Sequence, residues 1–157
     1  MKSKNRSLIL SHILVRAFYV VLALVTVGCV LLLFNKELLL TYHSISLLIA
    51  VPFGLGALIC LDKLLSNLKK KIVFDKENVT VLSNLSWVFF GVSFVTLVEI
   101  IVLFIVQGTI DIFSAIFIYP LYPIMCVGEF FIGLIVRVVK HSFESAVMLK
   151  EENDLTI

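Results

Sequence analysis

Four long apolar blocks constrain this chain more than any other feature of its sequence. The blocks cover residues 8–34, 45–61, 85–106 and 112–136. Each approaches or exceeds the ~20 residues that a helix needs to cross a hydrocarbon core about 30 Å thick. They do not show the alternation of polar and apolar residues that a membrane β-barrel requires, and only 15% of the chain is charged. The sequence therefore predicts an all-α membrane protein with four transmembrane helices.

Lysine and arginine are divided unevenly between the two sides of this layout. Of the 13 basic residues, Lys36 falls in a predicted loop on one side and Arg16 inside the first helix. The other eleven fall on the opposite side: Lys2, Lys4, Arg6, Lys63, Lys69, Lys70, Lys71, Lys76, Arg137, Lys140 and Lys150. Because cytoplasmic segments keep an excess of Lys and Arg, we expect a multi-pass plasma-membrane protein with both termini in the cytoplasm. The basic rim is expected to contact anionic lipid of the bilayer and not nucleic acid.

Three of the helices are expected to continue into the cytoplasm. We expect one domain over 1–157, with helices at about 8–34, 45–68, 78–106 and 112–147 and an acidic tail at 148–157. Leu64, Leu65 and Leu68 continue an apolar stripe of the second helix at helical spacing. Asp75 is a candidate N-cap of the third helix, accepting from backbone amides near Asn78. These features predict a helical hairpin outside the membrane, with the end of the fourth helix packed beside it.

The hairpin and the end of the chain resemble a known family. Residues 64–87, LLSNLKKKIVFDKENVTVLSNLSW, contain a helix ending in leucine, a short basic turn, Phe-Asp, Asn-Val and a spaced leucine. These positions are Leu68, Phe74, Asp75, Asn78, Val79 and Leu82, and the chain ends in ENDLTI. They resemble the YoaS-like family of bacterial four-helix membrane proteins, a domain of unknown function, although Lys71 stands where glycine is expected. The resemblance implies a four-helix membrane protein, often encoded beside a small helix-turn-helix transcription regulator, and no established activity.

The hairpin and tail are the candidate docking surface for a cytoplasmic partner. The candidate residues are Lys69, Lys70, Lys71, Phe74, Asp75, Asn78, Glu152, Asp154, Leu155 and Ile157. The leading hypothesis is a membrane-embedded regulatory protein that binds a cytoplasmic protein, such as the helix-turn-helix regulator that the resemblance implies. Alternatively, the apolar stripes only close a small bundle, and the acidic tail is a solvated chain end or a latch against the basic residues 69–71.

Three ionisable residues fall inside the predicted membrane segments: Arg16, Glu99 and Glu129. An unpaired charge at the bilayer centre costs at least ~2.5–3.5 kcal/mol. Arg16 and Glu129 both lie about 12 Å from the cytoplasmic edge at the helical rise per residue, so we expect a buried ion pair between them. Glu99 lies about 12 Å from the outer edge, with no cation at its depth. It is expected to be either a neutral, hydrogen-bonded group or a proton-coupling group.

Two further functions fit parts of the sequence. One is a small transporter or channel, formed as a homo-oligomer, that uses the three intramembrane charges. The other is immunity to a membrane-active peptide, which fits the short outer loops. The sequence contains no metal-ligand spacing, no glycine-rich phosphate loop and no catalytic triad at one depth, so we expect neither an enzyme nor a metal or other cofactor. Cys29, Cys60 and Cys126 are expected to be separate buried hydrophobic residues.

The charge distribution predicts a topology that reporter fusions can measure. Reporters fused at Lys71 and at Ile157 should be cytoplasmic, and a reporter fused at Thr41 should be external, because basic segments resist translocation. An external signal from the fusion at Ile157 would contradict the predicted orientation.

Overall fold

The computed structural model describes residues 2–34, 38–70, 72–106 and 120–154 of the chain. Four helices follow one another: α1 (Lys2–Leu32), α2 (Leu38–Lys69), α3 (Lys76–Val106) and α5 (Leu121–Asp154). The described residues contain no strand. Each of the four helices contains a segment of 25 to 33 residues that is long and apolar enough to cross a membrane. The all-α, four-span prediction is therefore confirmed, and the chain is a multi-pass membrane protein.

The helices extend further than the apolar blocks alone predict. The first helix begins at Lys2, before the expected start at residue 8, and the second begins at Leu38 and not near residue 45. The last helix continues through Asp154, although the tail was expected to begin at residue 148. Met, Leu, Lys and Glu, which fill positions 148–152, are all strong helix formers, so the helix has no local reason to stop. The expected start of this helix, at 112–119, lies outside the described residues.

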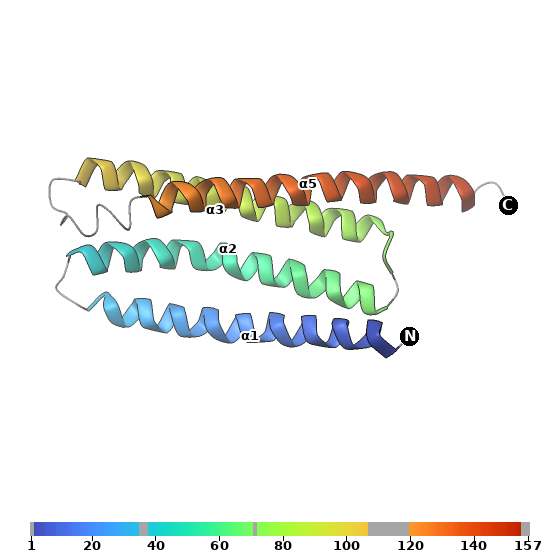
Figure 1. Cartoon of the computed structure of the whole chain (residues 1–157), viewed down its shortest axis with the longest axis horizontal. Helices are drawn as coiled ribbons and strands as arrows, with labels where there is room; N and C mark the ends of the chain where they lie inside the picture. Colours follow the sequence, from blue (N-terminus) through green and yellow to red (C-terminus); the bar gives the residue numbers. More distant parts are fainter. Residues whose placement is uncertain (1, 35–37, 71, 107–119, 155–157) are drawn as a thin grey trace.

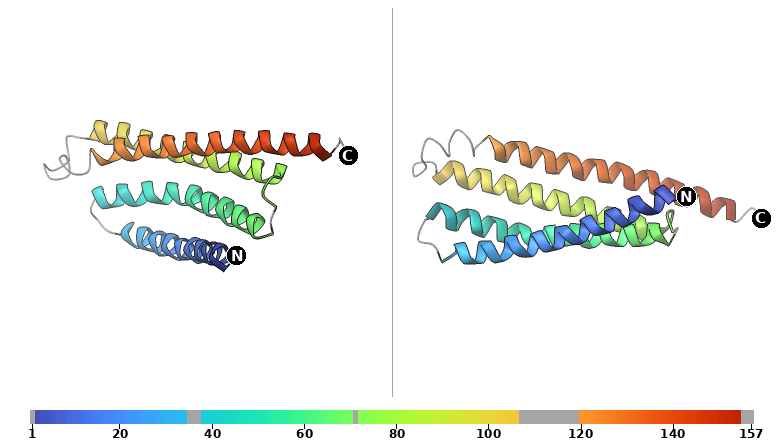
Figure 2. Two further views of the ribbon diagram at one scale, coloured as in Figure 1. Left: turned by 45° about the vertical axis from the view of Figure 1, so that its right-hand side comes forward. Right: turned by 60° about the horizontal axis from the view of Figure 1, so that its bottom comes forward.

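Helices that follow one another in the chain also pack against one another. α1 packs on α2, α2 packs on α3, and α3 makes its most extensive contact with α5. Figure 1 shows α1 and α5 at opposite edges of this arrangement, and the left view of Figure 2 shows the same order. The start of α1 and the end of α5 lie at the end of the molecule where α2 ends and α3 begins (Figure 1). We call this the hairpin end, and the opposite end, where α2 begins, the loop end.

Small residues allow α3 to approach both of its neighbours. Gly133 of α5 is buried against Phe90, and a Cβ atom added at Gly133 would lie 2.8 Å from the nearest ring carbon. Gly91 of α3 faces the ring of Phe53 on α2 in the same manner. The Ser93 hydroxyl donates a hydrogen bond to the backbone carbonyl of Cys126 on α5 at 3.0 Å. Glycine and serine are typical of membrane helix interfaces, because close backbone approach and hydrogen bonds replace the hydrophobic effect there.

Two contacts indicate where the bilayer begins at the hairpin end. The Arg137 guanidinium carbon lies 5.3 Å from the Trp87 ring centroid, and Nδ1 of His12 lies 3.5 Å from Oδ1 of Asp62. Tryptophan and charged side chains favour the membrane–water interface. From Trp87 to the end of α3 the helix is about 29 Å long, which matches a hydrocarbon core of about 30 Å. We therefore place the membrane boundary at these contacts, and we expect the parts of the helices beyond them to project into water at the hairpin end.

Because α5 lies so close to α3, the same substitution should have different effects on stability at two glycines of α5. Gly133→Leu should destabilise the bundle by about 1–3 kcal/mol, because the added side chain must displace Phe90. Gly128→Leu is the matched control, because a Cβ atom there meets nothing within 4 Å. Both changes raise helix propensity equally. Thermal unfolding in mild detergent measures the difference, and equal midpoints for the two variants would contradict the packing of Gly133.

Candidate functional site

The hairpin is closed by two buried asparagines, Asn67 of α2 and Asn78 of α3, which we call the asparagine clamp. Nδ2 of Asn67 donates to Oδ1 of Asn78 at 2.8 Å. Nδ2 of Asn78 donates to the backbone carbonyls of Ile72 at 2.9 Å and Val73 at 2.8 Å. The two asparagines are only 6% and 3% exposed. Because buried amides must find partners, the clamp holds both helices and the turn between them in one arrangement.

Asp75 caps the N-terminus of α3, as the sequence pattern predicts. Its carboxylate oxygen Oδ1 accepts a hydrogen bond from the backbone amide of Glu77 at 3.0 Å. Its backbone carbonyl accepts from the amides of Asn78 and Val79. An N-cap carboxylate satisfies an amide that has no partner within the helix and favours the positive end of the helix dipole. The N-cap prediction is confirmed, and Asp75 therefore has a structural task whether or not it also contacts a partner.

A polar cavity of about 420 Å³ lies beside the clamp. Glu77 lies at its wall, with Oε1 2.9 Å from Nζ of Lys63 and Oε2 accepting from Nδ2 of Asn67 at 3.1 Å. The lining residues come from α1, α2 and α3: Tyr19, Ile59, Asp62, Lys63, Ser66, Asn67, Lys70 and Glu77. Charges of both signs therefore line this cavity, which we call the hairpin cavity.

The end of α5 packs beside the hairpin. The rings of Phe74 and Phe143 are 5.5 Å apart between centroids, and Nζ of Lys76 lies 2.9 Å from Oε1 of Glu151. The sequence patterns singled out Phe74 but neither Lys76 nor Glu151. The candidate docking residues Lys69 and Lys70 are exposed at the end of α2.

The structure describes only part of the acidic end of the chain. Glu152 is exposed on the last turns of α5, and Asp154 is the last residue of that helix. The candidates Lys71, Leu155 and Ile157 lie outside the described residues. The latch expected between the tail and residues 69–71 therefore stays a prediction.

α5 extends past the rest of the hairpin end (Figure 1). From Arg137 to Asp154 it continues for about 25 Å, which we call the α5 extension (residues 138–154). Met148 and Leu149 on this extension are 59% and 62% exposed. Exposed apolar side chains within the membrane face lipid, but these two lie well beyond the Arg137–Trp87 contact. A contiguous exposed apolar patch in water can mark a contact site.

The expected ion pair between Arg16 and Glu129 is wrong for this structure. Within the described helices, no ion pair joins the two side chains, and Arg16 is exposed on α1. Oε2 of Glu129 instead accepts a hydrogen bond from the Thr96 hydroxyl of α3 at 2.9 Å. Equal depth did not bring the two charges together, because α1 packs on α2 while α5 packs on α3. The two residues lie on helices at opposite edges of the bundle (Figure 1).

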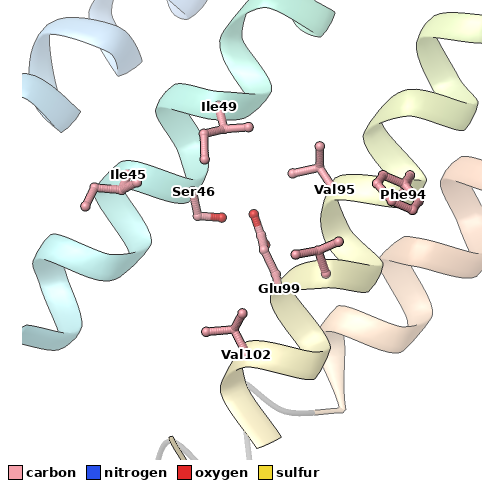
Figure 3. Close-up of a pocket in the computed structure, with 8 residues that line it drawn as sticks. Ile45, Ser46, Ile49, Phe94, Val95, Glu99 and Val102 are labelled. Atoms are coloured by element: carbon pink, nitrogen blue, oxygen red, sulfur yellow. The ribbon is translucent and has the colours of Figure 1, made fainter. Parts of the chain in front are cut away.

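Glu99 lies one helical turn from Thr96 and is half-buried. It lines a cavity of about 330 Å³ between α2 and α3, together with Ser46 of α2. In Figure 3 its carboxylate points from α3 toward Ser46. The sequence patterns singled out Glu99 and Glu129 but missed Thr96 and Ser46. The three-residue spacing of Thr96 and Glu99, inside an apolar block, is the signal that could have identified a polar strip on α3.

A further polar contact joins α2 and α5 at the loop end. The Tyr122 hydroxyl lies 2.9 Å from Nδ1 of His43, and the two rings stack with centroids 6.2 Å apart. In the parts of the chain that the structure places, no group of three or more His, Cys, Asp or Glu side chains could hold a metal ion.

Comparison with known proteins identifies a family but no activity. A family model described as "Protein of unknown function (DUF2975)" matches residues 8–157. No curated protein and no solved structure matches the chain.

The hydrogen bonds of the asparagine clamp predict that removing the Asn78 side chain destabilises the hairpin. Asn78→Ala should lower stability by about 1–3 kcal/mol, because it leaves buried carbonyl and amide groups without partners. Amide hydrogen exchange in the turn at 72–75 should become faster at the same time. The matched control is Asn84→Ala, at an exposed position of the same helix. Unfolding in mild detergent measures the stability of both variants. An Asn78→Ala variant as stable as the control would exclude the clamp as a structural element.

Proposed function

This chain belongs to the DUF2975 family of proteins of unknown function, and we propose that it is a regulatory protein of the plasma membrane. Its hairpin end faces the cytoplasm and binds a soluble protein there. The orientation follows from the eleven basic residues on that side of the predicted layout, which resist translocation. Among them Lys63 and Lys69 lie in the part of α2 that forms the hairpin, and Lys70 directly follows it.

The observation that carries this proposal is the exposed apolar pair on the α5 extension. Met148 and Leu149 are exposed and lie beyond the boundary that we infer from the Arg137–Trp87 contact, where exposure to water is unfavourable by about 25 cal/mol per Å² of apolar surface. A protein partner that covers them gains this free energy on binding. Methionine suits such a surface, because its flexible side chain adapts to more than one partner shape.

The extension is held in a definite position relative to the rest of the hairpin end. The Phe74–Phe143 contact and the Lys76–Glu151 ion pair join it to the turn and to the start of α3. A binding surface that is ordered before the partner arrives loses less conformational entropy on binding. A change in the packing of α5 on α3 within the membrane would move this surface, which is how the bundle would control binding.

The resemblance of the hairpin and tail to the YoaS-like family supports a small helix-turn-helix transcription regulator as the partner. A partner surface with an apolar groove and an acidic rim would suit the apolar pair together with the exposed side chains of Lys69, Lys70 and Lys150. Charge complementarity of this kind favours association and selects among partners. In this proposal the regulator is held at the membrane, away from DNA, until the bundle changes shape.

Partner capture tests this proposal with a matched pair of variants. The full chain is purified from its native cells in mild detergent, and the proteins that co-purify are identified and quantified. Met148→Ala combined with Leu149→Ala should reduce capture of the partner at least about tenfold, as expected when contacts worth more than ~1.4 kcal/mol are lost. Bundle stability should change little, because both side chains are exposed.

The control removes a similar apolar area from the same helix inside the membrane. Phe131→Ala combined with Ile135→Ala affects side chains that are comparably exposed but lie on the lipid-facing side of the boundary. This variant should capture the partner as well as the unchanged protein does. If the two double variants capture the same amount of partner, the α5 extension is not the docking surface.

A further inference from the structure

The cavity between α2 and α3 has the form of a ligand site. Its volume of about 330 Å³ lies within the range of small-molecule pockets, which are mostly apolar with a few convergent polar groups. Ile45, Ser46 and Ile49 line it from α2, and Val98, Glu99 and Val102 line it from α3. It lies in the half of the membrane-spanning region nearer the loop end, because Glu99 is closer to the end of α3 than to Trp87.

Two polar side chains converge on this apolar cavity. Figure 3 shows the Glu99 carboxylate extending from α3 toward the hydroxyl of Ser46 on α2. Ser46 is buried and Glu99 is half-buried, whereas Ile45 and Ile49 are about half exposed and border the lipid side. The attraction between a carboxylate and a cation is much stronger in such low-dielectric surroundings than in water.

We propose that this cavity binds an amphiphilic organic cation, with the ammonium group beside Glu99 and the apolar chain along the isoleucine and valine side chains. An anion would be repelled by the carboxylate, and a neutral apolar molecule would gain nothing from it. A hard metal cation needs about six oxygen ligands, whereas Glu99 and Ser46 are the two lining residues with side-chain oxygens. The exposed lipid side of the cavity lets such a ligand enter directly from the bilayer.

The second membrane carboxylate does not belong to this cavity. Glu129 comes from α5 and accepts a hydrogen bond from Thr96, one helical turn before Glu99 on α3. The described cavity lining does not include it. Glu129→Gln therefore removes the neighbouring membrane carboxyl group and leaves every lining residue of the cavity in place, which makes it the comparison variant for Glu99→Gln.

Equilibrium dialysis with decylammonium as the probe tests the proposal. The full chain is reconstituted in lipid nanodiscs, and empty nanodiscs measure the probe that simply partitions into lipid. The unchanged protein should show saturable binding above the empty discs. Glu99→Gln should weaken it at least about tenfold, equivalent to ~1.4 kcal/mol, and Glu129→Gln should change it less than about twofold, equivalent to ~0.4 kcal/mol.

A second variant tests whether binding occurs in the cavity, and a neutral ligand tests whether it depends on the charge. Val102→Phe fills the cavity with an apolar side chain and should also reduce binding, while circular dichroism and size-exclusion chromatography confirm that each variant is folded. Decanol, which has the same chain without the charge, should compete poorly with decylammonium. Binding that is absent in the unchanged protein, unaffected by Glu99→Gln, or displaced equally well by decanol would overturn the proposal.

Discussion

The close approach of α3 to its two neighbours is the constraint on which the rest of the structure depends. Gly91 allows Phe53 of α2 to lie against one side of α3, and Gly133 of α5 accepts Phe90 from α3. In lipid no hydrophobic effect drives helices together, so van der Waals contact and interhelical hydrogen bonds must do so. Two polar contacts inside the membrane-spanning region depend on α3: Thr96 reaches Glu129 of α5, and Glu99 faces the cavity shared with α2.

The membrane boundary reverses which side chains can be exposed at low energetic cost. Within the membrane-spanning region, exposed apolar side chains contact lipid favourably, whereas the few polar groups need hydrogen-bond partners. Beyond the Trp87–Arg137 contact the situation reverses, because ion pairs such as Lys76–Glu151 are solvated and the exposed Met148 and Leu149 become unfavourable. The same helix, α5, crosses both regions, and this continuity is what would couple an event in the membrane to a cytoplasmic surface.

Much of the fold and part of the candidate site could be predicted from local patterns. The number of helices follows from block length, and the N-cap at Asp75 follows from a polar residue placed just before a helical run. The Arg16–Glu129 pair failed because counting residues along a helix gives depth but not lateral neighbours. The asparagine clamp escaped prediction for a similar reason: Asn67 and Asn78 occur on different helices, and only the turn between them brings their amides within 2.8 Å.

The sequence by itself determined that the chain is a four-helix membrane protein, because each apolar block must satisfy its backbone hydrogen bonds internally in lipid. It also determined which side of the four-helix layout is strongly basic, because the positions of Lys and Arg relative to the apolar blocks can be read without the tertiary structure. Only the tertiary structure decided which polar groups meet. Glu129 meets Thr96 and not Arg16, and Glu99 faces Ser46 across a cavity. The reason is that helix order and rotation depend on small-residue contacts between helices, which no single helix specifies alone.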